Sequence, residues 1–235
     1  MSTHTTPPSQ RRLGAGALAL AGVLFFLYNA VRPWRDETTV AGAEEALSSA
    51  WWIVSHLCAM LGFVLVTLGF LAVRSAVQGT PGQNAGRKAV VAGIIGTGLT
   101  LPYYGAETFG LHAVAAAHRD GASFDLLDVT DAVRFDPTAA TMFVTGLVVL
   151  AVAAVHAALA VRRSGVLARH SGSLVALGFV LFIPQFFGPA PVRIAHGVLL
   201  TVGSAWLAWA LWRAEPNTAV PRQTSEAAGP PAFTG

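Results

Sequence analysis

The sequence predicts an all-α integral membrane protein, a bundle of six transmembrane helices whose N and C termini are both cytoplasmic. Two observations lead to this fold class. Hydrophobic residues make up 54% of the 235 residues and charged residues only 11%, whereas a soluble domain has roughly 25% charged residues. The apolar residues also gather into segments of about the length that crosses a ~30 Å hydrocarbon core. These six segments run from 13 to 31, 50 to 73, 89 to 117, 139 to 161, 170 to 188 and 192 to 212.

The first apolar segment follows Arg11 and Arg12, as the apolar region of a secretory signal peptide would. It is long for such a peptide, and no cleavage pattern of small residues follows it. We therefore expect this segment to be retained as a signal anchor and to form the first span.

The charged residues are distributed unevenly between the two sides of the predicted bundle. The two tails and the loops at 74–88 and 162–169 hold most of the basic residues, and the opposite loops hold most of the acidic ones. Because cytoplasmic loops are enriched in Lys and Arg, the basic side is predicted to be cytoplasmic. The net charge of +3 therefore reflects topology, and we infer no nucleic-acid binding from it. The basic side holds Arg11, Arg12, Arg74, Arg87, Lys88, Arg162, Arg163, Arg169, Arg213 and Arg222; the other side holds Arg32, Arg35, Arg119, Arg134, Arg193, Asp36, Glu37, Glu44, Glu45, Asp120, Asp125, Asp128, Asp131 and Asp136.

Composition divides the chain into three regions. Residues 12–213 form the six-helix transmembrane domain, whereas 1–11 and 214–235 lack apolar periodicity, which predicts disordered cytoplasmic tails. The single lysine and the abundance of Ala, Gly and Arg indicate a GC-rich bacterial genome, so the predicted location is the bacterial cytoplasmic membrane. The only cysteine, Cys58, excludes an intramolecular disulfide and a CxxC redox pair.

The longest outer loop, 118–138, spaces Asp125, Asp128 and Asp131 three residues apart around apolar residues. This pattern predicts a short amphipathic helix lying at the membrane interface. Because the loop has no glycine-turn calcium motif, we interpret the acids as a solvated face.

Three histidines lie at a similar depth in three different predicted spans. At 1.5 Å per helical residue, His56, His112 and His196 each lie ~6 to 9 Å below the outer surface. Neutral imidazoles at one level could coordinate a divalent metal and leave one position open to water or substrate. Two of them could instead bind the iron of a haem b axially. Polar packing between helices is the structural alternative.

Glu107 is an acidic residue inside a predicted span, and such residues are functional candidates. It lies ~15 Å from the outer end of its span, close to the bilayer midplane. It could be a neutral acid there, or a carboxylate beside a cation or a metal. Tyr103 lies four residues earlier on the same helix face, so both are candidate catalytic residues. His112 is ~140° further around the helix, so it joins Glu107 only through a kink or bulge, which Pro102 could provide.

Two further sets of residues lie near the outer ends of the spans. Trp34, Trp51 and Trp52 are typical of an interfacial aromatic belt. Arg193, three residues before His196, is expected to reach the surface or to pair with a loop acid. An anionic ligand above His196 would also suit this arginine.

Three functions remain open at this stage. The first is a metal- or haem-dependent membrane enzyme or redox protein, with Glu107 and Tyr103 as catalytic residues and the three histidines as ligands. The second is a cofactor-free acid catalyst in which Glu107 protonates a lipid-like or isoprenoid substrate. The third is a non-enzymatic carrier or assembly protein of the lipid bilayer.

Overall fold

The computed structural model describes residues 8–214, and every regular element in that range is helical. The predicted all-α class is therefore confirmed for this part of the chain. The first helix begins within the predicted tail 1–11, and residues 1–7 and 215–235 of the two predicted tails lie outside the described residues. The long helices are α1 (Pro8–Ala30), α3 (Ala50–Ala76), α4 (Gln83–Gly105), α7 (Pro137–Ser164) and α9 (Ala190–Arg213). The short elements are α2 (Val40–Leu47), α5 (Leu111–Arg119), α6 (Leu126–Arg134), α8 (Ser173–Val180), the π-helical turn η1 (Ala106–Gly110) and the 3-10 turn η2 (Pro184–Phe187).

Five helices among the described residues are long and apolar enough to cross a membrane. Large apolar side chains remain exposed along them, and Leu61, Ile94 and Val202 are each more than half exposed. Apolar surface of this extent marks contact with a membrane or a partner, so the structure agrees with a helical, multi-pass membrane protein. The five spans are Arg11–Ala30, Ala50–Ala76, Gln83–Arg119, Pro137–Ser164 and Ala190–Arg213.

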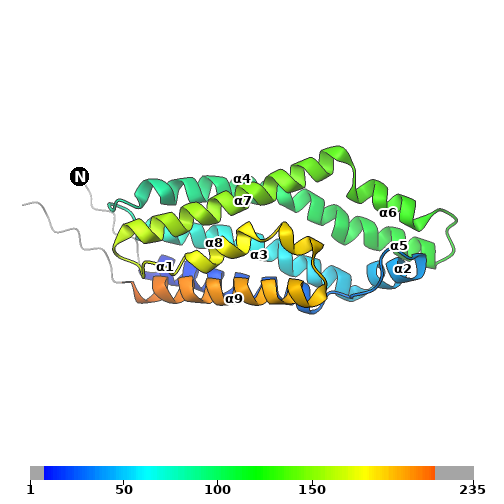
Figure 1. Cartoon of the computed structure of the whole chain (residues 1–235), viewed down its shortest axis with the longest axis horizontal. Helices are drawn as coiled ribbons and strands as arrows, with labels where there is room; N and C mark the ends of the chain where they lie inside the picture. The colour runs from blue at the N-terminus through cyan, green and yellow to red at the C-terminus, as the bar shows by residue number, and fades with distance from the viewer. Residues whose placement is uncertain (1–7, 215–235) are drawn as a thin grey trace, which may run out of the picture.

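The predicted span from 170 to 188 is not one continuous helix. Its helix α8 ends at Val180, and η2 begins only at Pro184. The amide of Phe182 bonds the carbonyl of Phe179, which tightens the chain, and Pro184 has no amide hydrogen with which to continue an α-helix. The segment nevertheless lies between α7 and α9, as Figure 1 shows.

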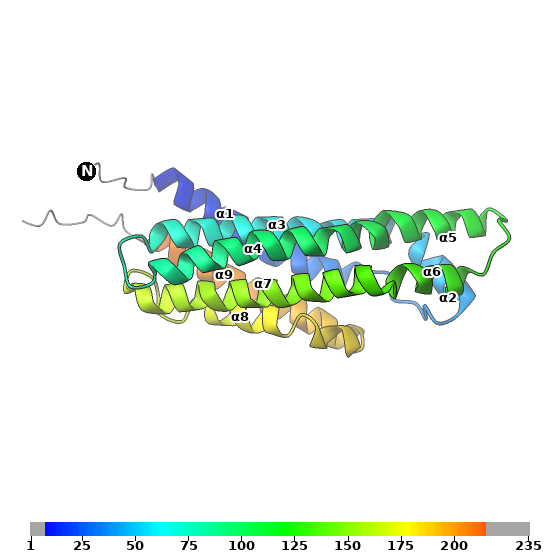
Figure 2. The same cartoon turned by 90° about the horizontal axis from the view of Figure 1, so that it is seen from above.

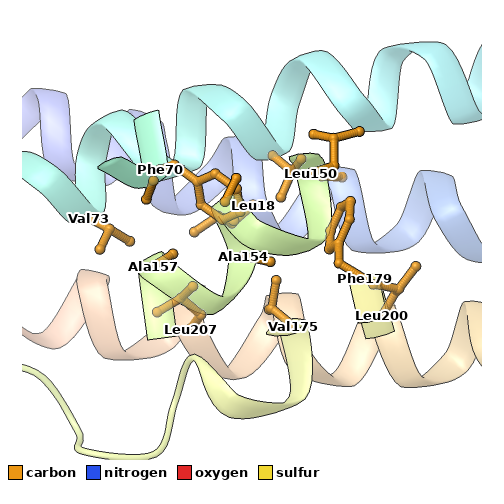
Figure 3. Close-up of a cluster of buried hydrophobic side chains, with 14 of the residues drawn as sticks. Leu18, Phe70, Val73, Leu150, Ala154, Ala157, Val175, Phe179, Leu200 and Leu207 are labelled. Carbon is orange, nitrogen blue, oxygen red and sulfur yellow. The ribbon is translucent and has the colours of Figure 1, made fainter. Parts of the chain in front are cut away.

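The long helices pack closely because glycines let their backbones approach. A Cβ atom on Gly96 would lie 2.8 Å from the backbone nitrogen of Leu150, and one on Gly146 would lie 2.5 Å from Oγ1 of Thr100. These contacts join α4 to α7, while α1 packs between α3 and α9. In Figure 3 side chains such as Leu18, Phe70, Leu150, Phe179 and Leu207 meet in the common core.

Helices α2, α5 and α6 form a separate cluster, the cap, at the end of the bundle far from the start of α1 and the end of α9 (Figures 1 and 2). Its core contains Leu47, Leu111 and Leu126 together with Trp52 from α3. The loop helix predicted within 118–138 is present as α6, and its preceding residue Asp125 accepts hydrogen bonds from the amides of Leu127 and Asp128. The cap covers the end of the bundle where the polar residues gather.

Candidate functional site

A cavity of about 510 Å³ lies where the cap meets the bundle. One part of its wall is charged and polar, and the rest is apolar or aromatic. The polar part consists of Tyr28, Arg32, Glu37, His56, Tyr103, Tyr104, Glu107, Arg134 and Arg193. The apolar part consists of Phe135, Ala140, Phe143, Val144, Leu147, Ile183, Phe186 and Phe187.

Two carboxylates and two guanidiniums form a continuous ion-pair network at the polar end. Glu37 accepts from Arg32 at 2.8 Å through Oε1 and from Arg134 at 2.7 Å through Oε2. Arg134 also donates from Nε to Glu107 at 3.0 Å. The side chains of all four residues are less than one-fifth exposed, so these pairs are weakly screened by solvent.

Burial and ion pairing act in opposite directions on Glu37, which lies in the loop before the cap. Burial alone would raise the pKa of its carboxyl, but the nearby guanidiniums of Arg32 and Arg134 outweigh this and lower it. Glu37 is therefore held as a carboxylate between the two arginines.

Two tryptophan rings separate three arginines in what we call the arginine–tryptophan ladder. Arg193 lies 5.0 Å from the ring centre of Trp34, and Arg32 lies 5.5 Å from the same ring. Arg32 is also 4.6 Å from the ring centre of Trp52, and Arg134 is 5.8 Å from it. The negative faces of the rings stabilise neighbouring cations that would otherwise repel. Trp52 is completely buried, so its expected place in an exposed aromatic belt is wrong.

Glu107 reaches this network from a π-helical turn. The amide of Leu111 bonds the carbonyl of Ala106, a five-residue span that widens the helix, and the indole of Trp52 donates to the Glu107 carbonyl at 2.8 Å. Such single-turn bulges are frequent at functional sites. This turn begins four residues after Pro102, but His112 bonds the carbonyl of Leu47 and does not join Glu107.

Glu107 lies on a helical path that is longer than the hydrocarbon core is thick. The helical path from Gln83 to Arg119 contains 37 residues, so it is ~55 Å long and exceeds the ~30 Å hydrocarbon core. Glu107 is level with Glu37 and Arg134, which lie outside the five spans. The depth of the Glu107 carboxylate in a membrane stays a prediction, and among the described residues its cationic partner is Arg134.

Tyr103 and Glu107 face the same cavity. The Tyr103 hydroxyl donates to the backbone carbonyl of Arg134 at 3.0 Å, and its ring stacks on Phe143 at 4.2 Å between ring centres. Tyr103 thereby positions the last residue of α6. Its catalytic role remains a prediction.

His56 also lines the cavity, on the opposite helix α3. Its Nδ1 is 2.8 Å from the carbonyl of Trp52. A carbonyl can only accept, so Nδ1 carries the hydrogen and Nε2 of the neutral ring is an acceptor. Ser55 also approaches Nδ1, at 3.1 Å.

The other two histidines bind carbonyls at the ends of short helices. Nδ1 of His112 is 2.8 Å from the carbonyl of Leu47, the last residue of α2. Nε2 of His196 is 2.8 Å from the carbonyl of Gly178 near the end of α8. Neither residue lines the cavity.

The three histidines therefore have equal predicted depth but separate surroundings. Within residues 8–214 no three side chains of the His, Cys, Asp and Glu types are arranged to hold one metal ion. The roles of His56, His112 and His196 as ligands of a divalent metal or haem b remain predictions, and of the three only His56 borders the cavity.

Sequence reasoning identified Glu107, Tyr103 and His56 but not their charged partners. Arg32, Glu37 and Arg134 were interpreted only as loop charges that report topology. A signal was available in the sequence, because Arg32 and Glu37 lie on either side of Trp34, just beyond the outer end of the first predicted span.

Comparison with known proteins identified no relative: no protein-family model, curated protein or solved structure matches this chain.

Proposed function

We propose that the chain is a six-pass protein of the bacterial cytoplasmic membrane that binds a lipid-like amphiphile in the cavity beneath the cap. The observation that supports this most is the cavity wall itself. Charged groups line one end, and Phe143, Val144, Phe186 and Phe187 line the other. An amphiphile has the same division between a polar head and an apolar chain, and ligand sites generally combine apolar walls with a few placed polar groups.

The charge distribution supports cytoplasmic termini. All acidic residues within 8–214 lie between Asp36 and Asp136, in the cap or at its end of the bundle. Basic residues predominate at the other end, where Arg12 packs over Trp212 and Arg213 over Trp209. Under the positive-inside rule, this asymmetry supports an orientation with the cap on the outer side.

Six crossings require that the segment containing α8 and η2 traverse the membrane in place of a long helix. Broken helices occur at membrane depth where protein covers their free backbone groups. Here His196 donates to the freed carbonyl of Gly178, and α7 and α9 pack on both sides.

The cavity opens toward lipid beside this broken segment. Phe187, at the end of η2, is 88% exposed, and Val144 on α7 is 46% exposed. An apolar chain could thus leave the cavity sideways into the bilayer without crossing a polar surface.

A chemical step on the bound amphiphile is the second candidate function. His56 Nε2 is an acceptor on the cavity wall and Glu107 is a paired carboxylate there, so either could take a proton from a ligand. A His56→Gln variant that binds the amphiphile but accumulates it unchanged would support this second function.

The binding function is tested by identifying small molecules that copurify with the protein in mild detergent. We expect about one amphiphile per chain for one cavity, and loss of it in Ala140→Trp, because Ala140 lines the cavity and the larger ring fills it. Ile95→Trp is the matched control, since Ile95 is half exposed on the lipid-facing side of α4.

If folded Ala140→Trp retained as much amphiphile as the wild type and Ile95→Trp, binding in this cavity would be contradicted. So would a wild-type protein that takes up no amphiphile after transfer into nanodiscs of bacterial lipids.

A further inference from the structure

We infer that the cavity selects an anionic head group, a phosphate or a carboxylate on one long apolar chain, and that Arg193 is the residue that binds it. This inference rests on the proposed function and specifies its ligand. It follows from the pairing of the charges in the ladder, from an unused donor on Arg32, and from a second groove that continues the cavity.

Arg193 is the ladder arginine without an acidic partner. Arg32 and Arg134 pair with Glu37 and Glu107, but no carboxylate of the described residues lies within ion-pair distance of Arg193. The expected pairing of Arg193 with a loop acid is therefore absent from this part of the chain.

Neutral contacts hold the Arg193 guanidinium at the cavity wall. Its Nε donates to Oε1 of Gln185 at 3.2 Å, and its Cζ is 5.0 Å from the ring centre of Trp34 and 5.3 Å from that of Phe186. Gln185 is buried and positions the arginine. The terminal nitrogens of a guanidinium held in this way remain free to bind an oxyanion through two parallel hydrogen bonds.

The charge balance of the cavity also favours an anion. Three arginines and two glutamates line it, which leaves one positive charge in a partly desolvated site. Arg32 additionally has a buried Nε with no hydrogen-bond partner among the described residues. A buried charged donor without a partner is costly. An oxyanion beside Arg32 and Arg193 would balance the extra positive charge and accept a hydrogen bond from Nε of Arg32.

The apolar chain of the ligand has a path along the bundle. A second groove of about 270 Å³ lies between α7 and α8 and shares Leu147 and Ile183 with the cavity. From Ala140 to His156, the two sites together follow α7 for ~24 Å at 1.5 Å per residue. The groove wall is apolar apart from His156 at its far end, so it suits a long hydrocarbon chain.

The experiment compares four probes that differ in head group or chain: hexadecyl phosphate, hexadecanoate, hexadecanol and inorganic phosphate. Each is added to the full-length protein in phosphatidylcholine nanodiscs, and bound probe is quantified by native mass spectrometry. The variants are Arg193→Gln, Arg193→Lys and Arg35→Gln. Arg35 is a matched control because it is an exposed arginine at the same end of the bundle that does not line the cavity.

We expect wild-type protein to retain hexadecyl phosphate or hexadecanoate in preference to hexadecanol, and to retain little inorganic phosphate. The preferred probe identifies the head group. Arg193→Gln should weaken its binding by about tenfold or more, as expected for the loss of a charge-assisted hydrogen bond. Arg193→Lys should restore part of this loss, and Arg35→Gln should bind as the wild type does.

Equal retention of hexadecanol and hexadecyl phosphate, unchanged in Arg193→Gln, would overturn the selection of an anion and leave amphiphile binding intact. Tight binding of inorganic phosphate alone would overturn the role of the apolar chain. Failure of the wild type to retain any of the three chain-bearing probes would overturn the proposed function itself. Melting temperatures of the variants separate loss of binding from loss of folding.

Discussion

At the scale of single residues, the cavity brings together charges that the membrane would otherwise exclude. Arg32 contacts both tryptophan rings and one carboxylate, so its charge is offset by several neighbours. Glu37 joins this arginine to Arg134 in the cap. An ion pair therefore links the loop after α1 to the helix α6.

Replacing Glu37 by Gln should change the pH dependence of stability. The pKa of the folded carboxyl lies below its ordinary value of 4.5, so its ion pairs stabilise the fold fully above that value. This contribution is lost as the pH falls through the lowered pKa. We expect the wild-type melting temperature to fall as the pH drops below the ordinary value of 4.5, and Glu37→Gln to lack much of this fall.

At neutral pH Glu37→Gln should also be less stable by about 2 kcal/mol, less than the cost of breaking a completely buried pair because its side chain is partly exposed. Glu45→Gln is the control, since Glu45 pairs with Arg35 on the surface. Thermal unfolding in detergent across this pH range measures both effects. Identical pH profiles for Glu37→Gln and wild type would show that the network contributes no stability.

At the scale of elements, the broken segment after α7 depends on His196. The amide of Phe182 bonds Phe179 rather than Gly178, and the buried Gly178 carbonyl accepts from His196 instead. A single side chain thus replaces the backbone bond that the helix loses where it ends.

His196→Ala should therefore destabilise the protein by about 1–3 kcal/mol through the unpaired carbonyl. His156→Ala is the control, because Nδ1 of His156 has no hydrogen-bond partner in the described residues. Thermal unfolding compares the two variants. A purely structural role for His196 further predicts the same metal content before and after its replacement, and stoichiometric metal lost only in His196→Ala would restore the predicted ligand role.

The contact between α4 and α7 offers a second test at this scale. Gly96→Ala adds a methyl group 2.8 Å from the Leu150 backbone, whereas Gly98→Ala on the same helix meets nothing within 4 Å. We expect Gly96→Ala to cost about 1–3 kcal/mol through overpacking and Gly98→Ala to be neutral or slightly stabilising. Equal melting temperatures would mean that the two helices do not approach as closely as described.

At the scale of the whole molecule, the account requires that the cap face outward and that the chain cross the membrane six times. Single cysteines at Asp120, Arg169 and Pro189 test both points, because all three residues are exposed and the native Cys58 is buried. A membrane-impermeant maleimide added to intact cells should label positions 120 and 189 and should reach 169 only after permeabilisation. Labelling of 169 and 189 from the same side would contradict a crossing between them.

Hydropathy predicted most of the fold, because each long helix corresponds to an apolar segment of membrane length in the sequence. It did not predict the break near Pro184, since the composition of 170–188 is as apolar as that of a continuous span. Hydropathy also did not predict that α2, α5 and α6 would pack together as a cap. Its core uses Leu111 and Leu126, which in the sequence are indistinguishable from the apolar residues of spans and interfacial helices.

The site was only partly predictable for a different reason. Glu107 was identifiable because an acid within an apolar run is rare. Its partner Arg134 is 27 residues away in sequence, and Glu37, which shares that arginine, is 97 residues from Arg134, so only tertiary packing brings these groups together. The shared predicted depth of the histidines does not bring them to one place in residues 8–214, because depth does not specify the direction in which a side chain points around its helix.

The most direct test of the central claim is to map where a photoactivatable amphiphile attaches. A long-chain phosphate carrying a diazirine is cross-linked to the protein in nanodiscs, and the modified peptides are sequenced. Amphiphile binding in the cavity predicts attachment concentrated at residues 140–147 and 183–187, and its loss in Ala140→Trp. Attachment spread evenly over the lipid-facing helices, including the exposed Val91 and Ile95, and unchanged in that variant would contradict it.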